Sequence, residues 1–182
     1  MKYTLEWVKS EFNRGNKIKY EFFWGHRPSK NGRITKSCFS QWWMSEFEID
    51  NIVYCCAEQY MMAEKARLFN DEEVLEEILK TKEQGKIKAL GRKVKNFNEE
   101  VWNKNKYDIV LRGNKAKFSQ NEALKEYLLT TGNKVLVEAS PYDRVWGIGL
   151  SADIEGIENP LLWKGENFLG FALMEVRDIL KG

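Results

Sequence analysis

The chain has 182 residues, enough for one compact domain that buries roughly 70% of the surface its unfolded form exposes. Its 29 basic and 27 acidic residues leave a formal charge of +2, too even a balance to indicate nucleic acid or a membrane surface from net charge alone. Three cysteines without C-x-x-C spacing and a single histidine argue against a disulfide framework and a zinc site, so we expect a reducing cytoplasm, no metal and no cofactor.

The first residues, Met1 to Trp7, carry charges where the apolar core of an export signal would be needed. No run of the chain approaches the ~18 apolar residues of a membrane span. We therefore expect a soluble protein that is not exported and does not enter a membrane.

Residues 17 to 60 begin with short extended pieces. Lys17–Phe22 alternates between polar and apolar side chains, and Phe47–Ile49 is followed by a turn at Asn51 and by Ile52–Tyr54. Alternation around a turn residue predicts a hairpin of these last two segments. In Cys38–Trp43 polar and aromatic residues alternate, which is unusual for a strand; the stretch either lines a pocket or is part of a sheet with large side chains.

The pattern changes to a helical one after Cys55. Glu58–Phe69 consists of strong helix formers without a breaker, and Asn70 or Asp71 can cap a second helix that ends near the Lys82–Gly85 loop. The apolar stripe of Ile87, Leu90 and Val94 predicts a third helix. Helix therefore dominates the middle of the chain.

The C-terminal half is expected to mix helix with one strand. The predicted features in chain order are Asn98 as the cap of a long helix through Leu111, Ser119–Glu122 as a capping box, Gly132 as a helix stop, Lys134–Ala139 as a buried strand, and a last helix from about Gly165 to Leu180. The fold class that follows is α+β, mostly helical, with a small β-sheet and a single domain over residues 1–182.

Two neighbouring segments, Asp143–Gly149 and Trp163–Gly170, have the composition of a small-molecule site. Together they hold a carboxylate, two indoles, an amide and several glycines. Glycines let the backbone approach a ligand, indoles offer flat apolar walls, and Asp143 and Asn167 supply polar contacts that fix orientation. We expect these segments to be loops around a pocket.

The first long helix presents an acid and an amine on one face. Glu58, Met62 and Lys65 are spaced i, i+4 and i+7, which puts Glu58 and Lys65 about 10 Å apart along the helix axis. A solvated pair is the plainer interpretation. The apolar neighbours of Glu58, namely Tyr54, Met61 and Met62, favour a functional one.

Three further cationic residues, one arginine and two lysines, are open to a plain interpretation beside a functional one. Arg92 follows Gly91 on an otherwise apolar stripe, which suits a guanidinium reaching an anion past a small residue, or an exposed surface arginine. Lys115 and Lys117 fit charges that complement the C-terminal dipole of a helix, more so for Lys115 than for Lys117.

Taken together, the chain resembles the NADAR family, also called the YbiA-like family, from about Phe23 to Leu180. The resemblance is carried by seven blocks in order: Phe39–Trp43, Ala57–Ala66, Leu90–Arg92, Ala116–Phe118, Glu138–Pro141, Asp143–Gly149 and Trp163–Gly170. It implies a YbiA-like fold.

The resemblance also implies an N-glycosidase. Members of the family are associated with hydrolysing the N-glycosidic bond of ribosylaminopyrimidine phosphates, early intermediates of riboflavin biosynthesis, with release of ribose 5-phosphate. Others are associated with removing ADP-ribose from guanine in nucleic acid. Both reactions cleave a C1′–N bond of a ribosylated substrate.

Under this resemblance the catalytic residues are Glu58, Lys65 and Asp143. The two carboxylates would stabilise positive charge on the sugar, activate water or protonate the leaving nitrogen. Lys65 has two possible roles, a phosphate contact or an amine that forms a Schiff base with C1′ of an opened ribose. Arg92 would hold the 5′-phosphate and an indole would stack on the base; the substrate-binding set is Arg92, Trp102, Trp146, Gly147, Trp163 and Asn167.

Two alternatives stay open. The near-neutral net charge speaks against guanine in nucleic acid as the substrate, but a local basic patch can still serve it; its members are Lys86, Lys88, Arg92, Lys93 and Lys95. A non-catalytic module that binds ADP-ribose or a nucleotide would bind its ligand without turnover. The sequence does not indicate an oligomeric state.

Overall fold

The computed structural model describes residues 1–182 and contains seven α-helices, two short 3-10 helices and two two-stranded sheets. This confirms the predicted α+β, mostly helical fold. The chain divides into two compact units: unit 1 is Met1–Ser40 with Glu122–Gly182, and unit 2 is Gln41–Asn121. That the whole chain acts as one domain stays a prediction. None of the helices combines the length and apolarity that a membrane span needs.

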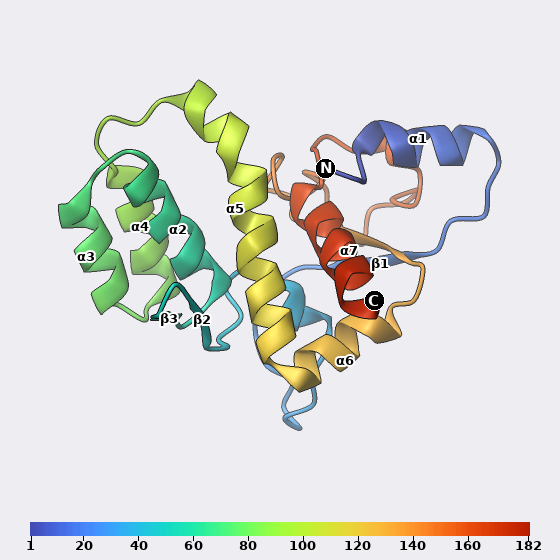
Figure 1. The fold of residues 1–182 in the computed structure, drawn as a ribbon. Coiled ribbons are helices and arrows are strands. Elements are labelled where there is room, and N and C mark those ends of the chain that lie inside the picture. The colour runs from blue at the N-terminus through green and yellow to red at the C-terminus, as the bar shows by residue number, and fades with distance from the viewer. The chain divides into compact units, whose positions relative to one another are not determined.

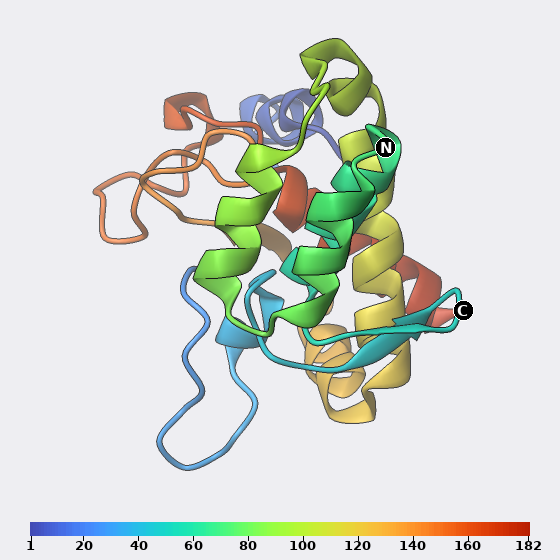
Figure 2. The ribbon, with the colours of Figure 1, turned by 90° about the vertical axis from the view of Figure 1, so that its left-hand side faces the viewer.

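Unit 2 is a hairpin followed by four helices. Strands β2 (Phe47–Ile49) and β3 (Ile52–Tyr54) pair antiparallel. The helices are α2 (Ala57–Leu68), α3 (Glu72–Lys80), α4 (Gln84–Lys93) and α5 (Glu99–Gln120). Helix α2 packs against the other three, as Figure 1 shows, and β2 packs against α5, as Figure 2 shows.

Local signals explain most of these boundaries. Asp50 and Asn51 both have positive φ, as a tight hairpin turn with matching twist requires, and the predicted hairpin is confirmed. The Asp71 carboxylate accepts from the Val74 N–H at the start of α3. The Asn98 amide oxygen accepts from the Val101 N–H at the start of α5, so this predicted cap is confirmed.

Two glycines let the helices of unit 2 come close. A Cβ on Gly91 of α4 would lie 1.9 Å from the Met62 sulfur of α2, and a Cβ on Gly113 of α5 would lie 2.5 Å from a ring carbon of Tyr60. Such distances are inside van der Waals contact, so a larger residue would require the Met62 or Tyr60 side chain, or the helices themselves, to move. Helix α2 is therefore the centre of the core of unit 2.

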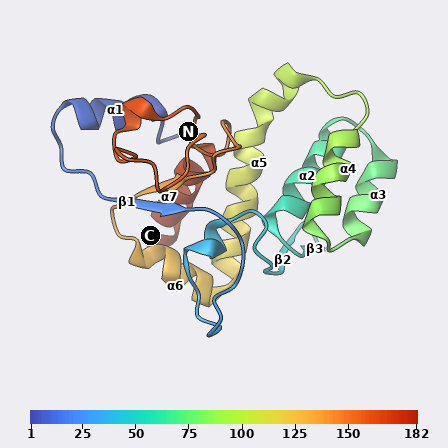
Figure 3. The same ribbon diagram turned by 180° about the vertical axis from the view of Figure 1, so that it is seen from behind.

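Unit 1 is built on a pair of parallel strands, β1 (Tyr20–Phe23) and β4 (Val135–Glu138). Helix α7 (Phe168–Lys181) packs on β4 and on α6 (Glu122–Thr130), and Figure 3 shows it beside β1. The remaining elements are α1 (Leu5–Asn13) and the 3-10 helices η1 (Lys36–Phe39) and η2 (Pro160–Leu162). The predicted buried strand is confirmed, and so is Gly132 as the stop after α6, with φ +60°.

Three predictions about local structure were wrong. Ser119 does not cap a helix: it lies inside α5, its hydroxyl donates to the Ala116 carbonyl, and α5 ends only at Gln120. The last helix begins at Phe168 instead of Gly165, since Asn167 has φ +55° and interrupts it. Lys36–Phe39 is a 3-10 turn, so the stretch around Cys38 is not a strand.

Candidate functional site

The amine of Lys65, on the predicted face of α2, contacts a backbone carbonyl and two aromatic rings. Its Nζ donates to the Gly91 carbonyl at 2.8 Å and lies 4.3 Å from the ring centroid of Phe97 and 5.7 Å from that of Trp102. Burial lowers the pKa of the Lys65 ammonium from its usual value. The carbonyl and the two ring faces favour the charged form, whereas desolvation favours the neutral amine.

The local fold accounts for this cage around Lys65. The close packing of Gly91 on Met62 brings the end of α4 against the end of α2. The chain then passes through Phe97 into the first turn of α5, which carries Trp102. We define the Lys65 cage as Lys65, Gly91, Phe97 and Trp102. The structure thus brings two predicted site residues, Lys65 and Trp102, together.

Arg92 follows Gly91 directly at the end of α4. Its side chain is exposed and makes no hydrogen bond or ion pair with another residue of the chain. A guanidinium without a protein partner keeps all its donors for an anion. The plain interpretation as a surface arginine is also compatible with this exposure, so its role in phosphate binding stays a prediction.

Glu58 lies in the first turn of α2 and is only 4% exposed. Its backbone N–H donates to the Gln41 carbonyl at 2.9 Å. The side chain of Gln41 in turn accepts at 2.8 Å from the amide of Asn114, a fully buried residue of α5. The predicted acid of unit 2 therefore lies in a polar part of an otherwise apolar core.

Lys117 is a buried residue whose importance sequence reasoning missed. It lies on α5 three residues after Asn114 and has no exposed surface, with its Nζ 5.1 Å from the ring centroid of Phe118. Lys117 does lie in the last turn of α5, where a cation complements the helix dipole, but unlike the exposed Lys115 it is fully buried. Spacing was the available signal, since Gly113 and Lys117 share a face at i, i+4.

In unit 1 the carboxylate of Asp143 organises its own loop. Its Oδ1 accepts from the backbone N–H groups of Val145 at 2.9 Å and Trp146 at 2.7 Å. Its backbone carbonyl accepts from the N–H of Gly149. Only Oδ1 takes part in these bonds, so Oδ2 is the atom left for a chemical role.

The glycines of this loop serve close backbone packing. A Cβ on Gly165 would lie 2.3 Å from the Gly147 carbonyl oxygen, and a Cβ on Gly147 would lie 2.7 Å from the Glu138 carbonyl oxygen. These contacts are with backbone, which cannot move aside as a flexible side chain can. The glycine content that indicated a ligand pocket is thus explained by the packing of the loop on itself and on β4.

Asn167 and Trp163 have structural hydrogen bonds. The Asn167 amide accepts from the Glu138 N–H and donates to the Leu136 carbonyl, both at 2.9 Å, and so fastens the start of α7 to β4. The indole N–H of Trp163 donates to the Ile157 carbonyl at 2.8 Å. Trp146 is half-buried and meets Phe168 edge to face. A part in substrate binding for these side chains stays a prediction.

Comparison with known proteins identifies the family. The family model described as the NADAR domain matches residues 22–181. The chain belongs to the NADAR family. The sequence blocks quoted above, from Phe39 to Gly170, all fall within this match.

Relatives of this NADAR protein include enzymes named as N-glycosidases. It is 47% identical over 167 residues to N-glycosidase R617 of Acanthamoeba polyphaga mimivirus, covering 88% of this chain and 95% of the relative. It is 30% identical to N-glycosidase YbiA of Escherichia coli, covering 79% of each chain. The chain thus belongs with hydrolases of N-glycosidic bonds.

Two further likenesses concern the fold and a plant protein. The NMR structure of E. coli YbiA matches with a TM-score of 0.72 and 25% identity, over 91% of this NADAR chain and 86% of that one. This confirms the predicted YbiA-like fold. The maize protein named riboflavin biosynthesis protein PYRR, chloroplastic, is 35% identical over 60% of this chain, which corresponds to 16% of the maize protein.

Proposed function

We propose that this protein hydrolyses the C1′–N bond of a ribosylaminopyrimidine phosphate and releases ribose 5-phosphate. The observation that carries the proposal is the Lys65 cage, in which a half-buried amine with a lowered pKa contacts two aromatic rings and the carbonyl of Gly91, the residue before Arg92. The names of the mimivirus and E. coli relatives support the bond type. The name of the maize relative supports a substrate from riboflavin biosynthesis.

Glu58 is the carboxylate we assign to the bond-breaking step. As the C1′–N bond breaks, positive charge grows on the sugar and the leaving nitrogen needs a proton. A carboxylate that is 4% exposed acts on such charge in a medium of low dielectric constant, where its effect is larger than in water. Water adds to C1′ last, at the imine that Lys65 forms, and so completes the hydrolysis.

For Lys65 the lowered pKa favours the amine role over a phosphate contact. A phosphate contact needs the ammonium, which desolvation disfavours, whereas a nucleophile needs the neutral amine. In that role the neutral Nζ adds to C1′ of the ring-opened substrate, where C1′ is doubly bonded to the leaving nitrogen. The bond from C1′ to that nitrogen then breaks, the two Nζ protons end on it, and the aminopyrimidine departs as a free amine while C1′ and Nζ form an imine. Water then hydrolyses the imine, which frees ribose 5-phosphate and restores the Lys65 amine.

The remaining residues are assigned as contacts. Arg92 holds the 5′-phosphate, since its guanidinium is exposed and unpaired. Trp102 stacks on the base, because its ring already forms a wall of the Lys65 cage. Asp143 is proposed as the second carboxylate through Oδ2. Trp146, Gly147, Trp163 and Asn167 support the substrate by holding the loop that carries Asp143.

The first test compares release of ribose 5-phosphate by the wild type and by Glu58→Gln. The amide has the same shape but carries no negative charge and cannot act as an acid, so we expect kcat to fall by about 10²–10⁴-fold. Glu64→Gln is the matched control on the same helix. Equal rates for wild type and Glu58→Gln would remove Glu58 from the reaction.

A second test addresses Lys65. Borohydride added during turnover reduces an imine to a stable amine, so the ribose 5-phosphate fragment should remain attached to Lys65 and appear by peptide mass spectrometry. Lys65→Arg keeps the charge and should show neither adduct nor turnover. Turnover by Lys65→Arg would support the phosphate contact instead.

A second candidate substrate is ADP-ribosylated guanine in nucleic acid. The observation that favours it is a row of exposed cations on α4 at Lys86, Arg92 and Lys93, although Lys95 is paired with Glu73 at 2.7 Å. Inhibition of turnover by single-stranded nucleic acid at low salt would favour this substrate. Tight ligand binding without turnover of either substrate would indicate a non-catalytic module.

A further inference from the structure

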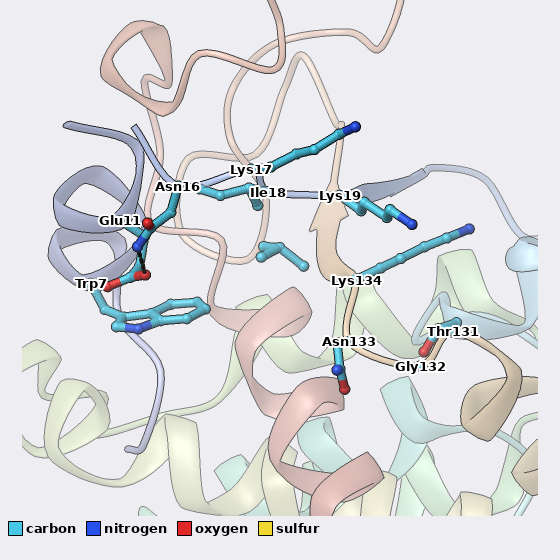
Figure 4. Close-up of a pocket in the computed structure, with 11 residues that line it drawn as sticks. Trp7, Glu11, Asn16, Lys17, Ile18, Lys19, Thr131, Gly132, Asn133 and Lys134 are labelled. Atoms are coloured by element: carbon cyan, nitrogen blue, oxygen red, sulfur yellow. Dashed lines mark hydrogen bonds between the residues drawn. The ribbon is translucent and has the colours of Figure 1, made fainter. Parts of the chain in front are cut away.

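Unit 1 contains a cavity to which none of the predicted catalytic or binding residues contributes. It has a volume of about 570 Å³, within the range typical of small-molecule sites, and opens between α1, the segment that leads into β1, and the turn between α6 and β4 (Figure 4). Its wall before β1 comes from residues 7–19, which precede the NADAR match at residue 22.

One end of the cavity is aromatic and apolar. Figure 4 shows the Trp7 indole directed from α1 into the space, which Ile18 and the buried Val135 also line. Trp7 is half-buried, and its ring centroid lies 5.0 Å from that of Tyr3, with the two planes tilted by 59°. A tryptophan held in this way offers a fixed surface on which a flat ring can stack.

The other end is cationic. The side chains of Lys17, Lys19 and Lys134 extend away from Trp7 in Figure 4. Lys134 is paired with Glu21 at 2.6 Å, whereas Lys17 and Lys19 are exposed and make no ion pair. The exposed amide of Asn133 also lines the cavity and has no hydrogen bond within the protein.

The only carboxylate that lines the cavity, Glu11, lies at the aromatic end and is already partnered. It accepts from Arg14 at 3.0 Å and from Asn16 at 2.7 Å. Its charge disfavours an anion beside Trp7 and so reinforces the polarity of the cavity.

The walls are fixed to the rest of unit 1. The Tyr3 hydroxyl donates to Asp178 of α7 at 2.7 Å, and α1 packs against η2. The Val135 N–H donates to the Lys19 carbonyl at 2.8 Å, which joins the two sides of the cavity. A preformed site costs little ordering on binding.

We propose that this cavity binds a nucleotide, with its base stacked on Trp7 and its phosphate held by Lys17 and Lys19. A nucleotide has a flat ring at one end and an anion at the other, which matches the polarity of the cavity. This site is separate from the Lys65 cage and does not rest on the proposed hydrolysis.

The test is calorimetric titration of the full chain with AMP, with adenosine and ribose 5-phosphate as probes that lack one half of the ligand. AMP should bind more tightly than either, and its affinity should fall as salt is raised. Trp7→Leu should weaken AMP about tenfold through lost stacking. The double variant Lys17→Gln/Lys19→Gln should weaken AMP and reduce the salt dependence.

Matched controls separate this site from other AMP binding. Trp24→Leu and the double variant Lys30→Gln/Lys36→Gln change exposed residues that do not line the cavity and should bind AMP as the wild type does. Glu58→Gln should also bind normally, even if it abolishes hydrolysis.

The wild type itself provides a readout that does not depend on variant folding. In ¹H–¹⁵N spectra, AMP should shift the Trp7 indole signal and the amides of residues 17–19. Failure of AMP to bind at millimolar concentration would overturn the proposal. So would equal binding of AMP and adenosine, or AMP binding that survives Trp7→Leu but is lost in Glu58→Gln.

Discussion

The two units use their conspicuous polar residues differently. In unit 1 the polar atoms of Asp143, Trp163 and Asn167 are bonded to nearby backbone groups, so these residues hold a loop together. In unit 2 the Arg92 guanidinium has no protein partner, and the Lys65 amine has one carbonyl and two ring faces. A polar group that is bonded to the backbone has a structural role that accounts for its presence. A charged group whose hydrogen-bond donors lack protein partners is a better candidate for binding substrate or for catalysis.

The largest loss of stability is expected at Gly165, where the loop of unit 1 packs on its own backbone. In Gly165→Ala the new Cβ would lie 2.3 Å from the Gly147 carbonyl oxygen and 2.7 Å from the Arg144 Cα, so we expect a loss of about 3–4 kcal/mol in the free energy of unfolding. Urea unfolding followed by tryptophan fluorescence measures it. Gly85→Ala is the control, because the nearest atom is 3.8 Å from its Cβ and a helix accepts alanine well. A loss in Gly165→Ala no larger than in the control would show that the loop yields easily.

Asn167 tests whether the amide is structural. Asn167→Ala leaves the Glu138 N–H and the Leu136 carbonyl unpaired and places alanine at φ +55°, so we expect a loss of about 3 kcal/mol. Asn167→Gly loses the same bonds without the steric cost of positive φ and should be less destabilised. Equal stability of the wild type and both variants would show that these two bonds contribute nothing.

Asp143 combines a structural role, through Oδ1, with the catalytic role that we propose for Oδ2. Asp143→Asn keeps an acceptor at Oδ1 and should change stability by less than about 1 kcal/mol, whereas Asp143→Ala loses two hydrogen bonds and about 1–2 kcal/mol. The rate at which Asp143→Asn turns over ribosylaminopyrimidine phosphate then measures the contribution of the negative charge of Asp143, separately from its hydrogen bonds. Unchanged turnover would leave Asp143 with a structural role only.

The smallest expected effect is a pH dependence in unit 2. Burial lowers the pKa of Lys65 in the folded protein from its ordinary value of 10.5. At pH values between the lowered pKa and 10.5 the unfolded chain therefore binds more protons than the folded one, so the free energy of unfolding should rise with pH in this range. The stability of the wild type relative to Lys65→Met should therefore increase from pH 8 to pH 10 in urea unfolding. A constant difference would mean that the amine is solvated as in the unfolded chain.

Most helix and strand positions could be predicted because their signals are local. Asp71 and Asn98 cap helices through N–H groups three residues away, and the turn at Asp50–Asn51 needs only its own backbone conformation. The family blocks likewise identified the fold without any contact being known. Helix α1 was missed, although Thr4 accepts from the Trp7 N–H as a cap should.

Errors arose where a distant contact competes with a local signal. Ser119–Glu122 has the spacing of a capping box, but the Asn121 amide donates to the Lys117 carbonyl and to the Glu46 carbonyl of the hairpin, which holds the break at Asn121. The glycines of the Asp143 loop indicated a ligand, whereas their neighbours are backbone atoms of Glu138 and Arg144.

The sequence by itself determined the family, the positions of most helices and strands, and the residue types available for cleaving a C1′–N bond. Only the tertiary structure decided that Lys117 is buried, that Phe97 completes the Lys65 cage, and that Trp7 faces a cavity formed with residues 131–135. Caps and periodicity act within a few residues of one another, whereas burial and cavities depend on segments that meet only after folding.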